Sequence, residues 1–171
     1  MILAVLLFFS GFSDARADLI DLNYPNFYAD PTVTVSVDGS TATFTEDSLL
    51  MSVLLSNDPY LGDPEVISGG PGQILSFDYD FVEPSGNDND DEFGVFVIDG
   101  STGVSVGAPF EFFVNSTDSG TISFDLSSLS GQTLGLQFQL SSFLDDLGLD
   151  SRLTISNVQL VPVPGAVLLA C

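Results

Sequence analysis

The stretch that decides the fold is TISFDLSSLSGQTLGLQFQLSSFLDDLGLDSRLTISNVQL, which runs from Thr121 to Leu160. Apolar and polar residues alternate in Thr121–Leu126 and again in Thr133–Ser141, and Arg152–Leu160 completes the unit. A period of two is typical of strands with one buried and one solvated face in an antiparallel sheet. The stretch therefore predicts three strands with two connections, which the earlier strands need as partners.

Shorter runs of the same kind precede this stretch. Thr32–Val37 and Ala42–Thr45 flank Asp38-Gly39, which is a hairpin signal. Leu49–Ser56 is a more continuous apolar run, which indicates a strand covered on both sides. Other runs that predict strands are Ile74–Val82, Phe93–Ile98 and Phe110–Val114. About nine short strands separated by turn signals, with no helical period, predict an all-β fold: an antiparallel β-sandwich of jelly-roll type.

Composition limits what the protein can do. The chain has 171 residues, of which 44% are hydrophobic, so it has room for one well-packed domain. Its 24 acidic residues stand against two arginines and no lysine, and the net charge of -22 makes nucleic acid and anionic membranes poor partners. Histidine is absent and the single cysteine is the last residue, which excludes histidine-dependent nucleophilic catalysis, ordinary zinc sites and an internal disulfide.

The N-terminus has the features of an export signal. Ile2–Phe12 is an apolar run too short to span a bilayer, and Ala15-Arg16-Ala17 follows as a small-x-small cleavage site. We interpret residues 1–17 as a signal peptide and 18–160 as the β-sandwich domain. The alternative is that the apolar run forms a buried N-terminal strand or helix.

Two acidic segments are candidate calcium sites, because calcium takes six to eight oxygen ligands. The first contains Asp88, Asp90, Asp91 and Glu92, and Phe93 stands where a helical calcium loop requires glycine. The second contains Asp145 and Asp150 and precedes the last strand. The alternative for both is a solvated loop whose charges oppose aggregation.

Tyrosines in predicted loops are candidate platforms for sugar rings. Tyr24, Tyr28 and Tyr60 lie in such segments, whereas most phenylalanines fall on apolar strand faces and are expected in the core. Glycoside hydrolysis needs a carboxylate pair with one raised pKa. No acidic residue stands in an apolar setting that would raise its pKa, so we expect no enzymatic activity.

The C-terminus resembles the sorting signal of bacterial PEP-CTERM proteins. Val161-Pro162-Val163-Pro164 matches their short proline motif, with Val161, Pro162 and Pro164 as its characteristic residues, and Gly165–Cys171 is similar to the start of their transmembrane helix. The rest of that helix and the basic cluster are missing, so 161–171 is interpreted as a truncated signal. The resemblance implies an exosortase-type sorting enzyme as a partner and membrane contact only transiently, through an intact C-terminal helix.

The body of the chain is similar to the jelly-roll, galactose-binding-like domains common in that family. The similarity lies in FDLSSLSGQTLGLQFQL and LDSRLTISNVQL, in which Asn157-Val158 is kept and Ser156 replaces an aspartate. The resemblance implies a structural calcium near such strand ends, with Asn157 among its ligands. It also implies an exported, non-catalytic protein of the cell surface or extracellular matrix, associated with polysaccharide. A purely structural protein and a carboxylate-dependent carbohydrate enzyme are the alternatives.

Overall fold

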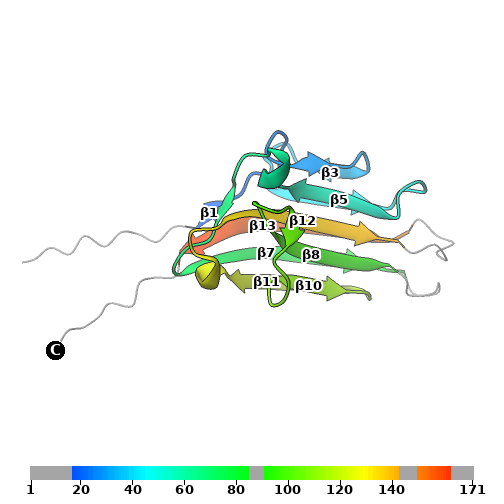
Figure 1. Cartoon of the computed structure of the whole chain (residues 1–171). Helices are drawn as coiled ribbons and strands as arrows, with labels where there is room; N and C mark the ends of the chain where they lie inside the picture. The colour runs from blue at the N-terminus through cyan, green and yellow to red at the C-terminus, as the bar shows by residue number, and fades with distance from the viewer. Residues whose placement is uncertain (1–16, 85–90, 143–149, 163–171) are drawn as a thin grey trace, which may run out of the picture.

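The computed structural model describes residues 17–84, 91–142 and 150–162, and these form two packed antiparallel sheets (Figure 1). The six-stranded sheet consists of β1 (Asp18–Leu19), β3 (Val33–Val35), β4 (Thr41–Thr45), β7 (Gln73–Val82), β11 (Asp118–Asp125) and β13 (Arg152–Pro162). The seven-stranded sheet consists of β2 (Tyr28–Ala29), β5 (Ser52–Asn57), β6 (Ile67–Ser68), β8 (Glu92–Asp99), β9 (Val104–Ser105), β10 (Glu111–Val114) and β12 (Thr133–Ser141). Two short 3-10 helices, η1 (Pro59–Leu61) and η2 (Leu126–Leu129), lie in connections.

The strand order is that of a jelly roll. The main path of one sheet is β11-β7-β13-β4-β3, and that of the other is β10-β8-β12-β5-β2. Strands that share a place in the two orders are therefore neighbours in the chain: β10 and β11, β7 and β8, β12 and β13, β4 and β5, and β2 and β3. Figure 1 shows this for β7 with β8 and for β12 with β13. The predicted β-sandwich is confirmed, and nine strands in the described part of the chain have three or more residues.

The core lies between the sheets and is made by the alternating residues that the sequence pattern predicted. Phe77 of β7 is fully buried, and its ring packs edge-on against Phe138 of β12 at a centroid distance of 5.2 Å. On β12 the even-numbered residues 134–140 are all fully buried, as are the odd-numbered residues 93–97 of β8. β12 and β13 each pair on both sides, with β8 and β5 and with β7 and β4 respectively, so they complete both sheets as expected.

The three strands predicted in the deciding stretch exist, and the structure adds that successive ones lie in opposite sheets. Two other sequence predictions differ from the structure. β5 alternates between buried and half-buried residues, so it is not covered on both sides, and residues 49–51 form an exposed turn before it. β13 continues past Leu160 through Val161 and Pro162, which pair with the first two residues of β7.

In the described ranges, no helix is long and apolar enough to cross a bilayer.

Candidate functional site

The outward side of the seven-stranded sheet carries aromatic and amide side chains where a solvated face would ordinarily carry charges. Along each strand of this sheet, core residues alternate with residues that point away from the core. The outward residues are the odd-numbered ones in β12 and the even-numbered ones in β8 and β5. We call the resulting surface the glutamine face. Its members are Tyr28, Ser52, Leu54, Ser56, Glu92, Phe96, Glu111, Phe113, Gln137, Gln139 and Ser141, with Gly94 as bare backbone.

Strand register arranges these residues in rows across the sheet. One row runs over five strands as Glu111, Phe96, Gln137, Ser56 and Tyr28. Neighbouring strands lie about 4.8 Å apart, so the row is about 19 Å long. The row therefore has an aromatic ring at β8 and another at β2, with an amide between them.

A hydrogen-bond network fixes the amides in the middle of the glutamine face. Gln137 Nε2 donates to Gln139 Oε1 at 3.1 Å, and Gln139 Nε2 donates to Ser141 Oγ at 2.6 Å and to Ser52 Oγ at 3.2 Å. The two serine hydroxyls are also hydrogen-bonded to each other, at 3.2 Å. Side chains that are ordered before binding lose less entropy when a ligand arrives.

The aromatic pair on one side of the face depends on a glycine. The rings of Phe96 and Phe113 meet edge-on with centroids 5.3 Å apart, and 47% of Phe113 is exposed. A Cβ added to Gly94 would lie 3.2 Å from the Phe96 ring and 3.3 Å from the Phe113 ring. Because Gly94 has no side chain, the two rings can lean over the strand and present one continuous apolar surface.

Tyr28 on the other side of the face is held by a buried carboxylate. Its hydroxyl donates to Asp30 Oδ1 at 2.7 Å, and Asp30 Oδ2 accepts the backbone N–H of Leu54 at 2.8 Å. The hydrogen bond to Asp30 raises the pKa of Tyr28, because ionised Tyr28 could not donate to a carboxylate. The ring stays 53% exposed, so Tyr28 is an oriented aromatic platform.

Residues 58–63 form a turn that we call the proline ledge. It crosses the outward side of the sheet next to the glutamine face, on the side of the first residues of β12. A Cβ on Gly135 would lie 3.0 Å from the Pro59 ring, and one on Gly100 would lie 3.2 Å from it. Ile98 points outward like Phe96 and is not part of the main core cluster, yet only 6% of it is exposed. Its burial is explained by the ledge, because Pro59 and Ile98 both lie next to Gly135. Asp58 caps the turn by accepting the Tyr60 N–H at 2.9 Å, so the ledge has a defined conformation.

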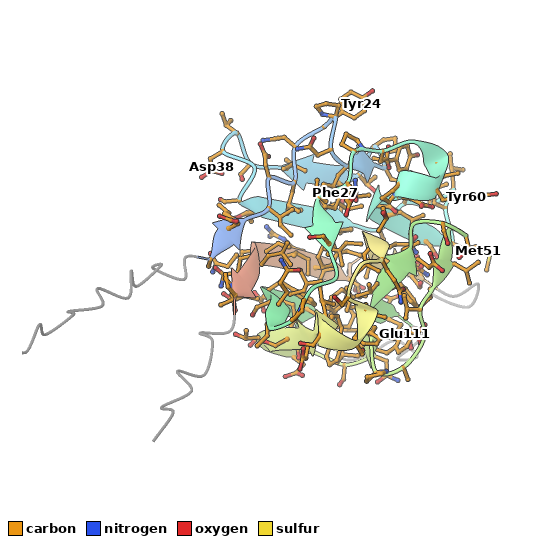
Figure 2. All side chains as sticks on the ribbon, turned by 60° about the vertical axis from the view of Figure 1, so that its left-hand side comes forward. Tyr24, Phe27, Asp38, Met51, Tyr60 and Glu111 are labelled. Atoms are coloured by element: carbon orange, nitrogen blue, oxygen red, sulfur yellow. The ribbon has the colours of Figure 1, made fainter. Side chains whose placement is uncertain are left out.

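The structure places the three predicted tyrosines in different surroundings. Tyr28 belongs to the glutamine face, whereas Tyr60 lies on the ledge, where its ring leaves no room for a side chain on Gly103. Tyr24 is exposed in the loop that precedes β2, off the strands that form the face (Figure 2).

Sequence reasoning missed Phe96 and Phe113, because most phenylalanines were expected in the core and no exception was named. The available signal was the pair Phe112-Phe113 within one strand, because adjacent strand residues must point to opposite sides.

Topology brings the strand ends that flank the two acidic segments to one end of the sandwich. Antiparallel pairing puts the β4–β5, β7–β8, β10–β11 and β12–β13 connections at the same end. Of the predicted calcium ligands, Asp91 is buried, Glu92 starts β8 and Asp150 is exposed at this end. Ser151 beside Asp150 is buried and donates its N–H to Glu46 Oε2 at 2.8 Å. The other predicted ligands, Asp88, Asp90 and Asp145, lie outside the described residues.

Asn157 is not brought to this end. It lies six residues along β13 from Ser151, a distance of about 20 Å in an extended strand. Its φ of 54° marks a bulge in β13, and its Nδ2 donates to Asp78 Oδ2 at 2.6 Å. Hydrogen bonds from Thr121 and Asn157 lower the pKa of Asp78. Among the described residues, no group of three or more acidic, histidine or cysteine side chains is placed to hold a metal ion.

Comparison with known proteins identifies the class of fold. No protein-family model matches the sequence, and no curated protein matches it. The mannan-recognising carbohydrate-binding module TmCBM27 superimposes with a TM-score of 0.50 at 16% identity, over 86% of this chain and 99% of that one. A carbohydrate-binding module specific for non-crystalline cellulose, CBM28, gives a TM-score of 0.45 at 12% identity, over 79% of this chain and 86% of that one.

A larger protein also contains a similar unit. The enzymatically active domain of bacteriophage CBA120 tailspike protein 4 gives a TM-score of 0.45 at 12% identity over 83% of this chain, which spans 20% of that chain's length. At 16% identity the similarity to TmCBM27 shows the fold alone. The chain has a β-sandwich fold like that of this carbohydrate-binding module.

Proposed function

We propose that the protein is a non-catalytic glycan-binding β-sandwich whose ligand lies across the strands of the glutamine face. The observation that carries the proposal is the row from Phe96 through Gln137 to Tyr28, in which hydrogen-bonding groups stand between two aromatic rings. Sugars have the matching chemistry, with apolar C–H faces and hydroxyl edges. The proline ledge blocks the face at one end along the strands. A glycan chain that crosses the strands is therefore accommodated more readily than one that runs along them.

The charge of the protein favours a neutral glycan. At a net charge of -22 the protein repels polyanions at long range. The centre of the face carries the amides of Gln137 and Gln139, which donate and accept hydrogen bonds without a charge.

The carboxylates of the face support a non-catalytic role. Glu92 and Glu111 are the two acidic members, and Glu111 lies opposite Phe96, four residues from Glu92. Their backbones are therefore about 14 Å apart. Carboxyl groups of glycosidase pairs are separated by roughly 5–9.5 Å, so both glutamate side chains would have to extend toward each other to form such a pair. Glu111 also accepts a hydrogen bond from Ser105 Oγ at 2.5 Å, and Ser105 pairs with Ile98, so this bond holds the Glu111 carboxylate toward the opposite end of β8 from Glu92.

The cellular setting belongs to the same proposal. The apolar N-terminus supports export, and Val161-Pro162-Val163-Pro164 supports sorting to the cell envelope or extracellular matrix by an exosortase-type enzyme. The mature protein would then lie among extracellular polysaccharides. A structural calcium held at the acidic end of the sandwich is part of this proposal, with Asp150 as the described candidate ligand.

Affinity electrophoresis through gels containing mannan, xyloglucan or amorphous cellulose tests glycan binding. We expect at least one polysaccharide to retard the protein, and Tyr28→Ala and Gln139→Ala to abolish the retardation. Tyr24→Ala is the matched control, because Tyr24 is an exposed tyrosine outside the face and its removal should change nothing. Free mobility in every gel would leave the structural-protein alternative, and equal retardation of all variants would place the site elsewhere.

A further inference from the structure

A separate pocket lies on the far side of the proline ledge from the glutamine face. Its volume is about 560 Å3, and it is lined by Pro59, Asp99, Gly100, Ser101, Gly131, Gln132 and Thr133. Along the outward side of β12 the order is Gln137, Gly135 and then Thr133, and Pro59 covers Gly135. The ledge therefore separates this end pocket from the face. Small-molecule sites typically occupy 300–1,000 Å3, so the end pocket can hold a compact ligand.

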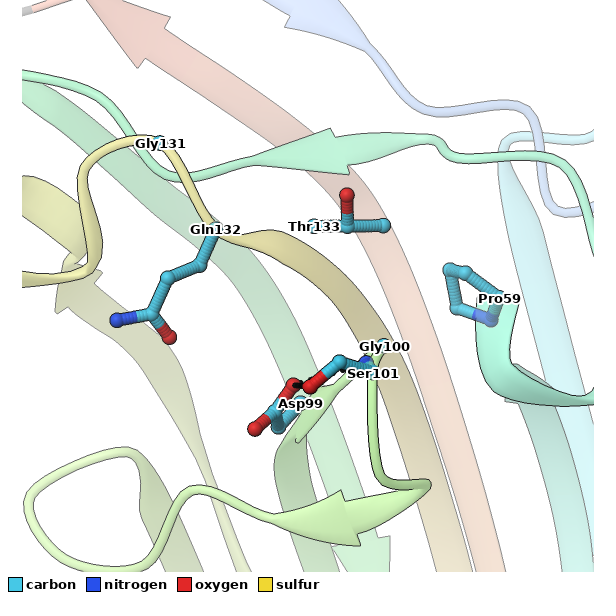
Figure 3. A pocket seen from close by; sticks show the side chains of 7 residues that line it. All are labelled: Pro59, Asp99, Gly100, Ser101, Gly131, Gln132 and Thr133. Atoms are coloured by element: carbon cyan, nitrogen blue, oxygen red, sulfur yellow. Dashed lines mark hydrogen bonds between the residues drawn. The ribbon is translucent and has the colours of Figure 1, made fainter.

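The lining of the end pocket combines one fixed carboxylate with neutral polar groups. Asp99 Oδ1 accepts the Ser101 N–H at 2.8 Å and the Ser101 hydroxyl at 2.7 Å, which orients the carboxylate. These hydrogen bonds from Ser101 lower the pKa of Asp99, so the group is ionised at neutral pH. In Figure 3 the Gln132 amide lies on the same side of the pocket as Asp99, and the Pro59 ring lies on the opposite side.

This chemistry selects among ligand classes. A phosphate or sulfate would face Asp99 with no lysine or arginine among the seven lining residues to balance it. A divalent cation would have one carboxylate, which is fewer than protein calcium sites provide. A neutral ligand with several hydroxyl groups satisfies the lining, because Asp99 accepts hydroxyl donors, Gln132 and Thr133 donate and accept, and Pro59 offers an apolar surface.

We propose that the end pocket binds a single neutral sugar unit, such as the terminus of a glycan chain, independently of the glutamine face. Together with the proposed function of the glutamine face, this pocket would give the protein two glycan sites separated by the proline ledge, which could join two chains or two parts of one chain. This inference goes beyond the proposed function, because the end pocket could be occupied whether or not the glutamine face binds a polysaccharide.

Amide NMR spectra of the 15N-labelled protein, titrated with methyl glycosides of D-mannose, D-glucose and D-galactose, test the proposal. We expect at least one glycoside to shift the amide resonances of Gly100, Gly131 and Thr133 in a saturable manner. Shifts confined to Gly94 and Gln139 would assign monosaccharide binding to the glutamine face and overturn the proposal. The absence of saturable shifts with all three glycosides would overturn it as well.

Three substitutions identify the groups that bind. Asp99→Asn keeps an oxygen that can accept from Ser101 but removes the charge, and we expect it to weaken the binding of the glycoside about tenfold or more. Gln132→Ala and Thr133→Val remove exposed polar groups and should each weaken it severalfold.

The chain contains a matched control for Asp99→Asn. Asp38-Gly39-Ser40 repeats the sequence Asp99-Gly100-Ser101, and Asp38 likewise accepts hydrogen bonds from the serine two residues later. Asp38→Asn should therefore leave the affinity for the glycoside unchanged. Equal affinities of wild-type protein and all three pocket variants, with spectra that show an intact fold, would overturn the proposal even if the glutamine face binds polysaccharide.

Discussion

The two adjacent phenylalanines of β10 offer a direct test of the division between core and glutamine face. Phe112 points inward, where its ring lies 5.3 Å from that of Tyr79 and 6.0 Å from that of Phe93. Phe113 points outward, contacts the Phe96 ring and is 47% exposed. The substitutions Phe112→Ala and Phe113→Ala remove the same atoms from neighbouring positions, so their effects compare the two sides of one strand.

The expected magnitudes differ enough to measure. Phe112→Ala removes a half-buried ring that packs against the core, and it should lower the free energy of unfolding by about 3 kcal/mol, the lower end of the range for phenylalanine. Phe113→Ala loses about half the burial of a phenylalanine and one ring pair, which amounts to about 1–1.5 kcal/mol. For a chain of this length each kcal/mol shifts Tm by about 2–4 °C, so we expect losses of about 6–12 °C and 2–6 °C.

Thermal unfolding followed by circular dichroism measures the stabilities, and affinity electrophoresis on the retarding polysaccharide measures binding. Phe113→Ala should abolish retardation although it is the more stable variant, whereas folded Phe112→Ala should retain it. Equal losses of Tm would show that Phe113 is a core residue. Retained binding by Phe113→Ala would refute the assignment of the aromatic pair to the ligand site.

Asn157→Ala should lower the free energy of unfolding in urea by about 1–2 kcal/mol, because only asparagine or glycine adopts its positive φ easily, and Asn157→Gly should be closer to wild type. Equal stabilities would contradict this account of the bulge. Hydrogen bonds from Ser36 and Ser40 lower the pKa of Asp38 to about 2. The contribution of Asp38 to stability is therefore complete above about pH 4 and is lost as the pH falls through about 2. Over this range the Tm of the wild-type protein should fall more steeply than that of Asp38→Asn. Parallel curves would refute the lowered pKa of Asp38. Millimolar calcium should raise Tm relative to EDTA at matched ionic strength, and Asp150→Asn should reduce the rise; no rise in the wild type would remove calcium from the proposal.

The sequence predicted the strands more reliably than their partners. β12 has the predicted bounds, because strict alternation over Thr133–Ser141 leaves one way to bury its apolar residues. The alternation does not state which sheet a strand joins, since pairing depends on residues far apart in the chain. The placement of β11, β12 and β13 in alternate sheets therefore needed the structure.

The candidate site was predicted only in part. Gln137 and Gln139 alternate with core residues, so their solvated side was evident from the sequence. In β8, however, every residue from Phe93 to Ile98 except Gly94 is apolar, so no period of two separates Phe96 from the core. The ledge could not be predicted from its own residues, because its position depends on Gly135 in β12 and on Gly100 just after β8, which leave room for Pro59.

The last strand described, β13, occupies the middle of its sheet, which governs when folding can finish. Until Arg152–Pro162 is available, β7 and β4 have no strand between them, so the six-stranded sheet stays in two parts. A chain passing in order through a narrow translocation channel could not complete the six-stranded sheet until its C-terminal segment had followed. The fold would then close only on the far side, with contacts of long sequence separation that form slowly.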